Sequence, residues 1–213
     1  MRHLFLLAAL FCACISYAQI RVQERLPKSK TGFALTTAKT RAKIYYDVND
    51  ALVIKRSAEL FARDIQMVTG QKPELIQKRE RAKALVIVGT IEKNQWICEL
   101  AQKGKIDIRP LQGAWERYLI QTVDNPSPGV AKALVIAGSD RRGAAYGLFS
   151  ISEMMGVSPW YWWGDVPVKT HKALYVDAPP TYSKTPSVKY RGIFLNDEDW
   201  GLKPWAAKTF EKE

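Results

Sequence analysis

Three consecutive acidic residues follow a short apolar run near the carboxyl end of the sequence. The run Tyr190–Leu195 is followed by Asn196, Asp197, Glu198, Asp199 and Trp200. This order is typical of a buried strand that presents acidic groups at its carboxyl end, where α/β barrels keep their active sites. Carboxylates close to apolar rings have raised and separated pKa values, which suits acid–base catalysis.

Two other interpretations of the acidic residues are less favoured. A calcium loop of the EF-hand type would need a glutamate at its twelfth position, and with Asn196 as the first position that place is taken by Ala207. We therefore predict no metal and no cofactor. A solvated acidic turn is the general alternative, but the preceding apolar run and the nearby Trp200 and Trp205 count against it.

The first residues have the pattern of a secretory signal peptide. Arg2 and His3 precede the apolar stretch from Leu4 to Ile15, and Ser16 and Ala18 are small residues at the positions that matter for cleavage. We expect cleavage before Gln19, a signal peptide over residues 1–18, and a secreted or periplasmic protein with no membrane contact after cleavage. A lipoprotein is the alternative, in which Cys12 or Cys14 carries the lipid.

Cysteine content and charge exclude several classes of protein. Without residues 1–18, Cys98 is the single cysteine, so the protein is no disulfide scaffold, and a buried, inert thiol is expected. The formal net charge of +11 permits acidic partners, including uronic-acid polysaccharides or nucleic acid. Because Lys and Arg are scattered along the chain, we expect a solvated basic surface and no nucleic-acid binding.

Strand-like and helix-like segments alternate over most of the chain. Continuous apolar runs at 84–89 and 133–138 predict strands covered on both faces. Helical spacing of apolar residues follows possible caps at Asn49 and Asp50 and ends at Gly70. The further expected segments are strands at 33–38, 42–46, 72–77 and 115–121, helices at 93–102 and 141–155, and a turn at 124–129. These patterns predict an α/β domain with a mixed sheet and helices on its faces, over residues 19–178.

Proline marks the expected end of this domain. Pro179, Pro180 and Pro186 predict a stiff linker over residues 179–187. Residues 188–213 would then hold the first β-strand and the start of a helix of an incomplete (β/α)8 barrel.

Two further motifs each allow two interpretations. Gly138–Gly143 follows a strand and opens a helix, as phosphate loops do, but it lacks the spacing of known nucleotide motifs. A tight connection capped by Ser139 or Asp140 is favoured. The aromatic run Trp160–Trp163 could stack on sugar rings, or it could pack as a hinge against a neighbouring domain.

The longest motifs resemble a known family. Tyr190–Leu202 with Lys203–Ala206, and Ser158–Pro167, closely resemble parts of glycoside hydrolase family 115, the xylan α-glucuronidases. Gly138–Gly147 looks like the same N-terminal domain, although this motif is shared more loosely with other families. Together these segments place most of the chain in the N-terminal domain and the first strand of the catalytic barrel.

The resemblance implies an activity and a set of site residues. Family members remove glucuronic acid or its 4-O-methyl ether from glucuronoxylan with inversion, which needs an acid and a base roughly 6.5–9.5 Å apart. Acidic xylan polysaccharide or oligosaccharide is the implied partner, and the full-length enzyme could be a homodimer. The implied substrate-binding residues are Arg191, Asn196, Asp197, Asp199 and Trp200, followed by Trp162 and Trp163.

The assignment of catalytic roles stays open among three carboxylates. Asp197, Asp199 and Glu198 are the candidates, and the first two are preferred because residues two apart on a strand share a face. Arg191 could equally contact substrate or be structural. The family's general acid and most sugar-binding residues lie beyond Glu213, so we expect the chain alone to be inactive. The alternative function is a non-catalytic carbohydrate-binding module that uses the aromatic run Trp160–Trp163.

Overall fold

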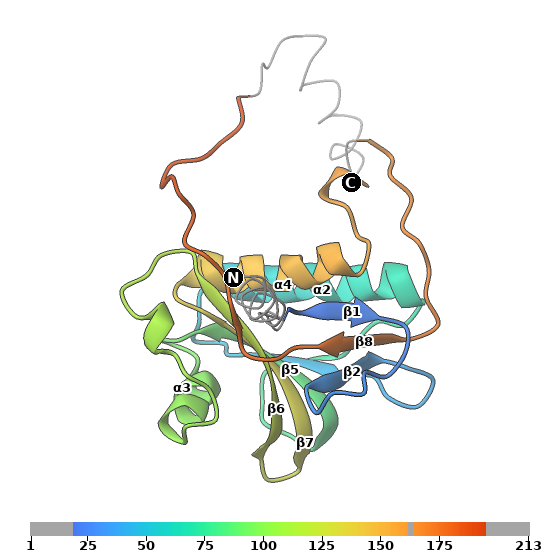
Figure 1. Cartoon of the computed structure of the whole chain (residues 1–213), viewed down its shortest axis with the longest axis horizontal. Helices are drawn as coiled ribbons and strands as arrows, with labels where there is room; N and C mark the ends of the chain where they lie inside the picture. The colour runs from blue at the N-terminus through green and yellow to red at the C-terminus, as the bar shows by residue number, and fades with distance from the viewer. Residues whose placement is uncertain (1–18, 162–163, 195–213) are drawn as a thin grey trace, which may run out of the picture.

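The computed structural model describes residues 19–161 and 164–194 (Figure 1). Within this range a six-stranded sheet has the order β4-β3-β5-β7-β6-β9, and a three-stranded sheet has the order β1-β8-β2. The strands are β1 Arg21–Gln23, β2 Gly32–Thr36, β3 Lys43–Tyr46, β4 Leu75–Ile76, β5 Ala82–Thr90, β6 Tyr118–Ser127, β7 Val130–Gly138, β8 Leu174–Asp177 and β9 Thr181–Tyr182. The predicted α/β class with a mixed sheet is confirmed.

The centre of the larger sheet is buried on both faces, as the continuous apolar runs predict. β3, β5 and β7 run parallel, while β6 is antiparallel to β7. Successive side chains of a strand point to opposite faces. Val86 and Val88 of β5 accordingly belong to one hydrophobic cluster, and Leu85 and Ile87 belong to the other.

Helices cover the two faces unequally (Figure 1). Helices α2 Leu52–Thr69 and α4 Arg141–Met154 lie side by side on one face, where apolar side chains of α2 such as Phe61 and Ile65 are fully buried. The other face is covered by α3 Gln95–Gln102 and the short 3-10 helix η1 Arg109–Leu111. The smaller sheet extends the core on the α2 and α4 side, because Phe33 of β2 and Val176 of β8 belong to the same cluster.

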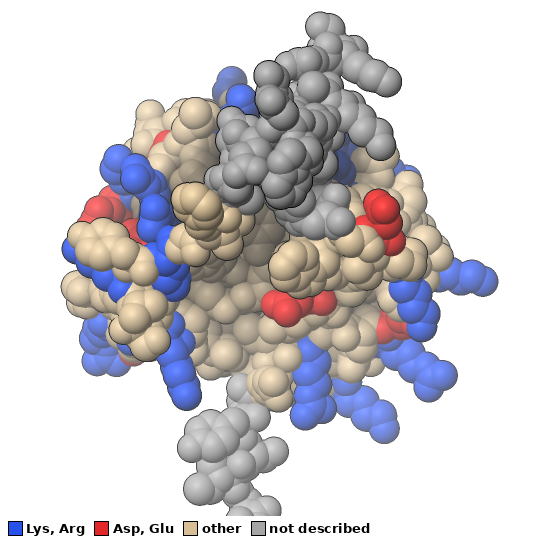
Figure 2. Space-filling model, turned by 90° about the horizontal axis from the view of Figure 1, so that it is seen from above, with Lys and Arg blue, Asp and Glu red and all other residues tan. Residues whose placement is uncertain are grey.

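The outer surface of α2 and α4 is partly apolar. Leu60, Tyr146, Phe149 and Met154 are 37–42% exposed on these two helices. In the view onto this side, Lys and Arg lie mainly around the rim and the visible centre carries few charges (Figure 2). Among the described residues, no helix is long and apolar enough to span a bilayer.

The expected cap of the first long helix was wrong. The N-cap of α2 is Ala51, and no side chain caps this helix end. The Asp50 carboxylate instead accepts hydrogen bonds from the backbone N–H of Thr90 at 2.7 Å and from its hydroxyl at 3.0 Å. Asp50 therefore connects the start of α2 to the end of β5, a long-range contact that competes with the local cap.

Strand β6 differs from its expected range at both ends. It begins at Tyr118 rather than near Trp115, because Glu116 has a positive φ of 55° that is incompatible with a strand. It also runs through most of the expected turn at 124–129, with a register irregularity between Asp124 and Ser127. The reversal itself takes place at Pro128 and Gly129, where Gly129 has a φ of 84°.

The segment after β8 only partly follows expectation. Within the predicted linker, Thr181 and Tyr182 form β9 and pair with Ile120 and Leu119 of β6, so the sheet continues into this linker. Residues 183–194 form no helix or strand, and residues 195–213 lie outside the described range. The barrel start is therefore not confirmed: a strand needs a hydrogen-bonded neighbour, and among the described residues none pairs with 190–194.

Candidate functional site

A cavity of about 470 Å³ lies at the carboxyl ends of β3, β5 and β7. The connections after these strands line it together with residues before β6 and in the C-terminal segment, among them Asp50, Thr90, Lys93, Glu116, Asp140, Arg142 and Lys189. From the neighbouring strands β3 and β5, helices α2 and α3 pass to opposite faces of the sheet. Ligands of open α/β sheets bind at such switch points, so this edge of the sheet is the candidate ligand site.

The loop before β6 is fixed to the connection between β7 and α4. The Glu116 backbone N–H donates to the Asp140 carboxylate at 2.7 Å, and the Arg117 N–H donates to the Ser139 hydroxyl at 3.0 Å. In return, the Ser139 N–H donates to the Arg117 carbonyl at 2.8 Å. These bonds stabilise the left-handed backbone of Glu116 and aim its side chain into the site.

The glycine motif at 138–143 is explained by this packing. A Cβ on Gly143 would lie 2.1 Å from the Arg117 carbonyl oxygen, and one on Gly138 would lie 2.2 Å from the Ala144 nitrogen. Asp140 caps α4 by accepting hydrogen bonds from the N–H groups of Arg142 and Gly143 at 2.9 and 2.8 Å. These donors, which a phosphate loop would offer to its ligand, are thus occupied, and the favoured structural role with Asp140 as cap is confirmed.

Arg191 is held by a carboxylate of the α/β domain. Its guanidinium forms a short ion pair with Glu116, whose side chain is only 5% exposed, and donates to the Val188 carbonyl at 2.6 Å. Arg142 binds the second carboxylate oxygen of Glu116 at 2.9 Å. The Arg191 guanidinium also lies 5.8 Å from the centre of the Trp115 ring and 3.4 Å from the Tyr146 hydroxyl.

The electrostatics of this cluster favour a structural anchor over acid–base chemistry. Arg191, and after it Arg142, lower the pKa of the Glu116 carboxyl below its usual range. Glu116 therefore stays ionised at neutral pH and is unsuited to act as a general acid. Sequence reasoning named Arg191 but missed Glu116 and its pairing with Arg142, because no local pattern links residues so far apart in the chain.

Most of the other predicted site residues lie outside the described range. Asn196, Asp197, Glu198, Asp199 and Trp200 belong to this group, and so do Trp162 and Trp163. Trp160 is described: it lies on the short 3-10 helix η2 Pro159–Tyr161 and is 65% exposed. Arg191 is thus the one predicted substrate-binding residue whose surroundings the described structure gives.

The one described cysteine, Cys98, has the surroundings of a structural thiol. Cys98 is half-buried, its thiol lies 3.2 Å from the Ile91 carbonyl oxygen, and burial raises the pKa of this thiol, as expected of an inert cysteine. Within residues 19–161 and 164–194, no three His, Cys, Asp or Glu side chains lie together as a metal site would require.

Comparisons with known proteins identify the family. The model of glycosyl hydrolase family 115 matches residues 183–213. A solved family GH115 4-O-methyl-alpha-glucuronidase, BtGH115A, described as specific for decorated arabinogalactans, is 34% identical, covers 85% of this chain and has a TM-score of 0.67. The chain spans 22% of the length of that protein. No curated protein matches the sequence.

Similarity to other solved enzymes is weaker. CpGH84D is 11% identical, with 76% of this chain and 22% of that chain covered and a TM-score of 0.45. A GH20 beta-N-acetylhexosaminidase from Streptomyces coelicolor A3(2) is 13% identical, with 80% and 25% covered and a TM-score of 0.39. The identity and fold shared with the glucuronidase, together with the family match at the C-terminal segment, show that this chain belongs to glycosyl hydrolase family 115.

Proposed function

We propose that this chain is the N-terminal part of an exported enzyme that removes glucuronic acid, or its 4-O-methyl ether, from an acidic polysaccharide with inversion. The observation that carries the proposal is the 34% identity to a 4-O-methyl-alpha-glucuronidase over 85% of the chain. The family match over residues 183–213 supports it independently, because it falls on the segment that contains the acidic cluster.

The proposed substrate is a polysaccharide that carries glucuronic acid side groups. Glucuronoxylan is expected from the sequence motifs, and the similar glucuronidase is described as specific for decorated arabinogalactans. Both polymers present the same uronic acid, whose carboxylate is attracted by a chain of formal charge +11. The experiment must therefore decide whether the sugar chain that carries the uronic acid is a xylan or an arabinogalactan.

Within this function we assign different roles to Arg191 and to the carboxylates after it. Asp197 and Asp199 are proposed to contact the sugar, with Glu198 as the third candidate. Arg191 is proposed to hold the start of this segment in place, since its guanidinium is already paired with Glu116. A substrate carboxylate would have to displace that pairing in order to bind Arg191.

The chain alone is proposed to release no glucuronic acid, because it spans only 22% of the similar glucuronidase. The test compares the purified 213-residue chain with a longer family protein that contains the same segment. Both are incubated with glucuronoxylan and with glucuronic-acid-decorated arabinogalactan, and released uronic acid is measured. Release by the longer protein alone supports the proposal. Comparable release by the short chain would contradict the inactivity, and no release by the longer protein would contradict the activity.

The structure offers no observation that favours the alternative of a carbohydrate-binding module at Trp160–Trp163. Two rings of this run are described. Trp160 is exposed but does not line the adjacent cavity between α2, α4 and η2, whereas Tyr161 lines it and its hydroxyl accepts a hydrogen bond from Arg63 at 2.6 Å, which ties this ring to the domain.

A further inference from the structure

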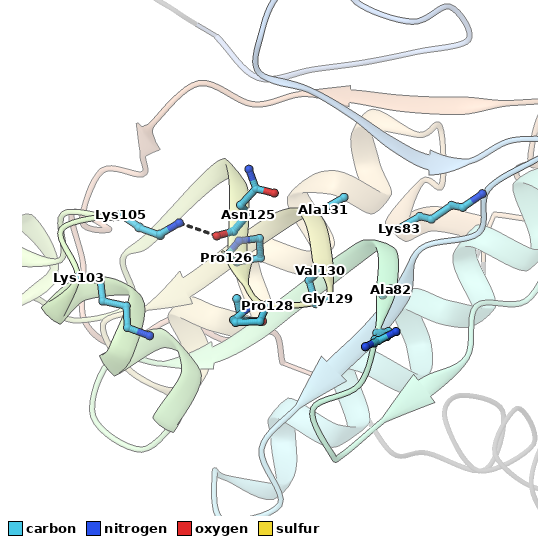
Figure 3. Close-up of a pocket in the computed structure, with 12 residues that line it drawn as sticks. Ala82, Lys83, Lys103, Lys105, Asn125, Pro126, Pro128, Gly129, Val130 and Ala131 are labelled. Carbon is cyan, nitrogen blue, oxygen red and sulfur yellow. Dashed lines mark hydrogen bonds between the residues drawn. The ribbon is translucent and has the colours of Figure 1, made fainter.

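A second cavity lies at the opposite end of the central sheet from Glu116. It has a volume of about 770 Å³ and is lined by the amino-terminal ends of β5 and β7, the tip of the β6–β7 hairpin, and the end of α3 (Figure 3). Pro126, Pro128 and Val130 form part of its wall. Because β5 has nine residues at about 3.3 Å each, roughly 30 Å separates this end of the sheet from the Glu116 site.

The charge of this cavity is of one sign. Four basic residues line it and no acidic residue does: Arg81, Lys83, Lys103 and Lys105. The nearby carboxylates are engaged elsewhere. Glu99 forms two hydrogen bonds with Arg79 at 2.8 and 2.6 Å, and Asp124 pairs with Lys132 at 3.1 Å. Lys103 reaches Glu99 only at 3.8 Å, so much of the positive charge is left without a close counterion.

Two of these basic side chains, Lys105 and Arg81, are held in place by contacts with the β6–β7 hairpin. The Lys105 ammonium donates to the Asn125 carbonyl at 2.5 Å and lies 3.4 Å from the Asp124 carbonyl, which places it against the hairpin tip (Figure 3). The stem of Arg81 packs over Gly129, with its Cγ 2.9 Å from where a Cβ would be. Lys83 points away from the hairpin in this view (Figure 3). The cleft is thus bordered by Arg81, Lys103 and Lys105, which keep donors for an anion.

We propose that this basic cleft binds uronic acid carboxylates of the polysaccharide, at a distance from the catalytic part. The choice of polyanion rests on the proposed function, whereas the cleft itself rests on its charge and geometry. The tip of the β6–β7 hairpin, which lines the cleft, lies at the far end of the sheet from residues 183–194, the segment that leads to the acidic cluster (Figure 1). A long acidic polymer can therefore contact both regions, and the second contact raises its local concentration near the enzyme.

The test is a binding measurement on the purified chain. Affinity electrophoresis in glucuronoxylan compares wild type with the double variant Arg81→Gln/Lys103→Gln. The control is Lys39→Gln/Lys172→Gln, which removes the same charge from two exposed lysines elsewhere. We expect about tenfold weaker binding in the cleft variant alone, which corresponds to about 1.4 kcal/mol for the loss of two exposed charge contacts. Binding should weaken as salt is raised and should be lost on carboxyl-reduced polymer. Circular dichroism and thermal unfolding verify that each variant is folded.

Three outcomes would overturn the proposal. Equal losses in both double variants would show attraction by net charge without a site. Unchanged binding to carboxyl-reduced polymer would exclude carboxylate recognition. Tighter binding of a single-stranded oligonucleotide, lost in the cleft variant, would assign the cleft to nucleic acid. Release of uronic acid by the longer protein is measured separately, so a failed cleft and a failed catalytic function are distinguished.

Discussion

Arg191 forms an ion pair with Glu116, a residue 75 positions earlier in the chain. The pair joins the segment matched by the family model to the loop before β6. Glu116 adopts a left-handed backbone conformation that Asp140 supports through a hydrogen bond, and Asp140 also caps α4. The same turn thus stabilises a helix and places the carboxylate that holds Arg191.

Replacing Glu116 with Gln should free the Arg191 side chain. Trypsin cleaves after a basic residue only when that side chain can enter its binding pocket, and the Glu116 ion pair holds the Arg191 guanidinium back. We expect cleavage after Arg191 to become several-fold faster relative to cleavage after Lys189, which is exposed. Mass spectrometry of a timed digest gives this ratio within one sample.

The matched control for this prediction is Glu59→Gln. Glu59 is a partly exposed carboxylate on α2 that pairs with Arg56, so the substitution changes the net charge equally and leaves Arg191 untouched. An unchanged cleavage ratio in the Glu116 variant would show that the ion pair does not restrain Arg191.

Replacing Asp140 with Ala should destabilise the domain. The substitution removes both cap hydrogen bonds of α4 and the acceptor for the Glu116 N–H. Loss of an N-cap costs about 1–2 kcal/mol, so chemical denaturation should show a loss in the free energy of unfolding of about this size. Asp140→Asn keeps one cap oxygen and should lose less. Equal stability of wild type and Asp140→Ala would refute the role of this turn.

Two helix glycines of α4 should respond differently to substitution by Ala. A Cβ at Gly143 would meet the Arg117 backbone carbonyl at 2.1 Å, whereas one at Gly147 would meet the Ile136 Cγ2 methyl at 2.6 Å. A backbone carbonyl held in place cannot yield, so Gly143→Ala should lower the free energy of unfolding by about 3 kcal/mol. The Ile136 methyl is buried on a β-branched side chain, but a side chain yields more than a backbone carbonyl, and Ala favours a helix over Gly by about 1 kcal/mol, so Gly147→Ala should cost less. Comparable losses in denaturant titrations would contradict this difference.

Local patterns predicted the fold and failed where distant groups compete. Sequence patterns predicted the strands around Leu85 and Leu134 and the cap at Asp140, because these features depend on residues close by in the chain. The cap expected at Asp50 was wrong because Thr90, 40 positions away, takes its carboxylate. In the same way, β6 starts late because Glu116 turns toward Asp140.

The candidate site was predictable in part for the same reason. The acidic cluster at 197–199 was found from its sequence but lies outside the described residues. Arg191 was found through the family motif, while its partner Glu116 carries no motif of its own. The basic cleft draws on β5, α3 and the β6–β7 hairpin, so scattered lysines became one surface only through folding.

The buried carboxylate of Asp64 should make stability depend on pH. Asp64 on α2 is 5% exposed and lines a cavity of about 490 Å³ together with Ser152 of α4. Burial raises the pKa of its carboxyl, and the nearby Ser152 hydroxyl and the positive charge of Arg63 oppose this only in part. The native state therefore holds this proton more tightly than the unfolded chain, and stability falls as pH rises from about 4 through the raised pKa. Asp64→Asn cannot ionise, so it should raise Tm at pH 7 more than at pH 4.

Thermal unfolding between pH 4 and pH 8 measures this difference. Glu153→Gln is the control, because Glu153 lines the same cavity with an exposed side chain and its substitution changes the net charge equally. The control should leave the pH dependence of Tm as in wild type, since no buried charge is removed. A Tm difference between Asp64→Asn and wild type that is the same at pH 4 and pH 7 would show that burial does not raise the pKa of Asp64.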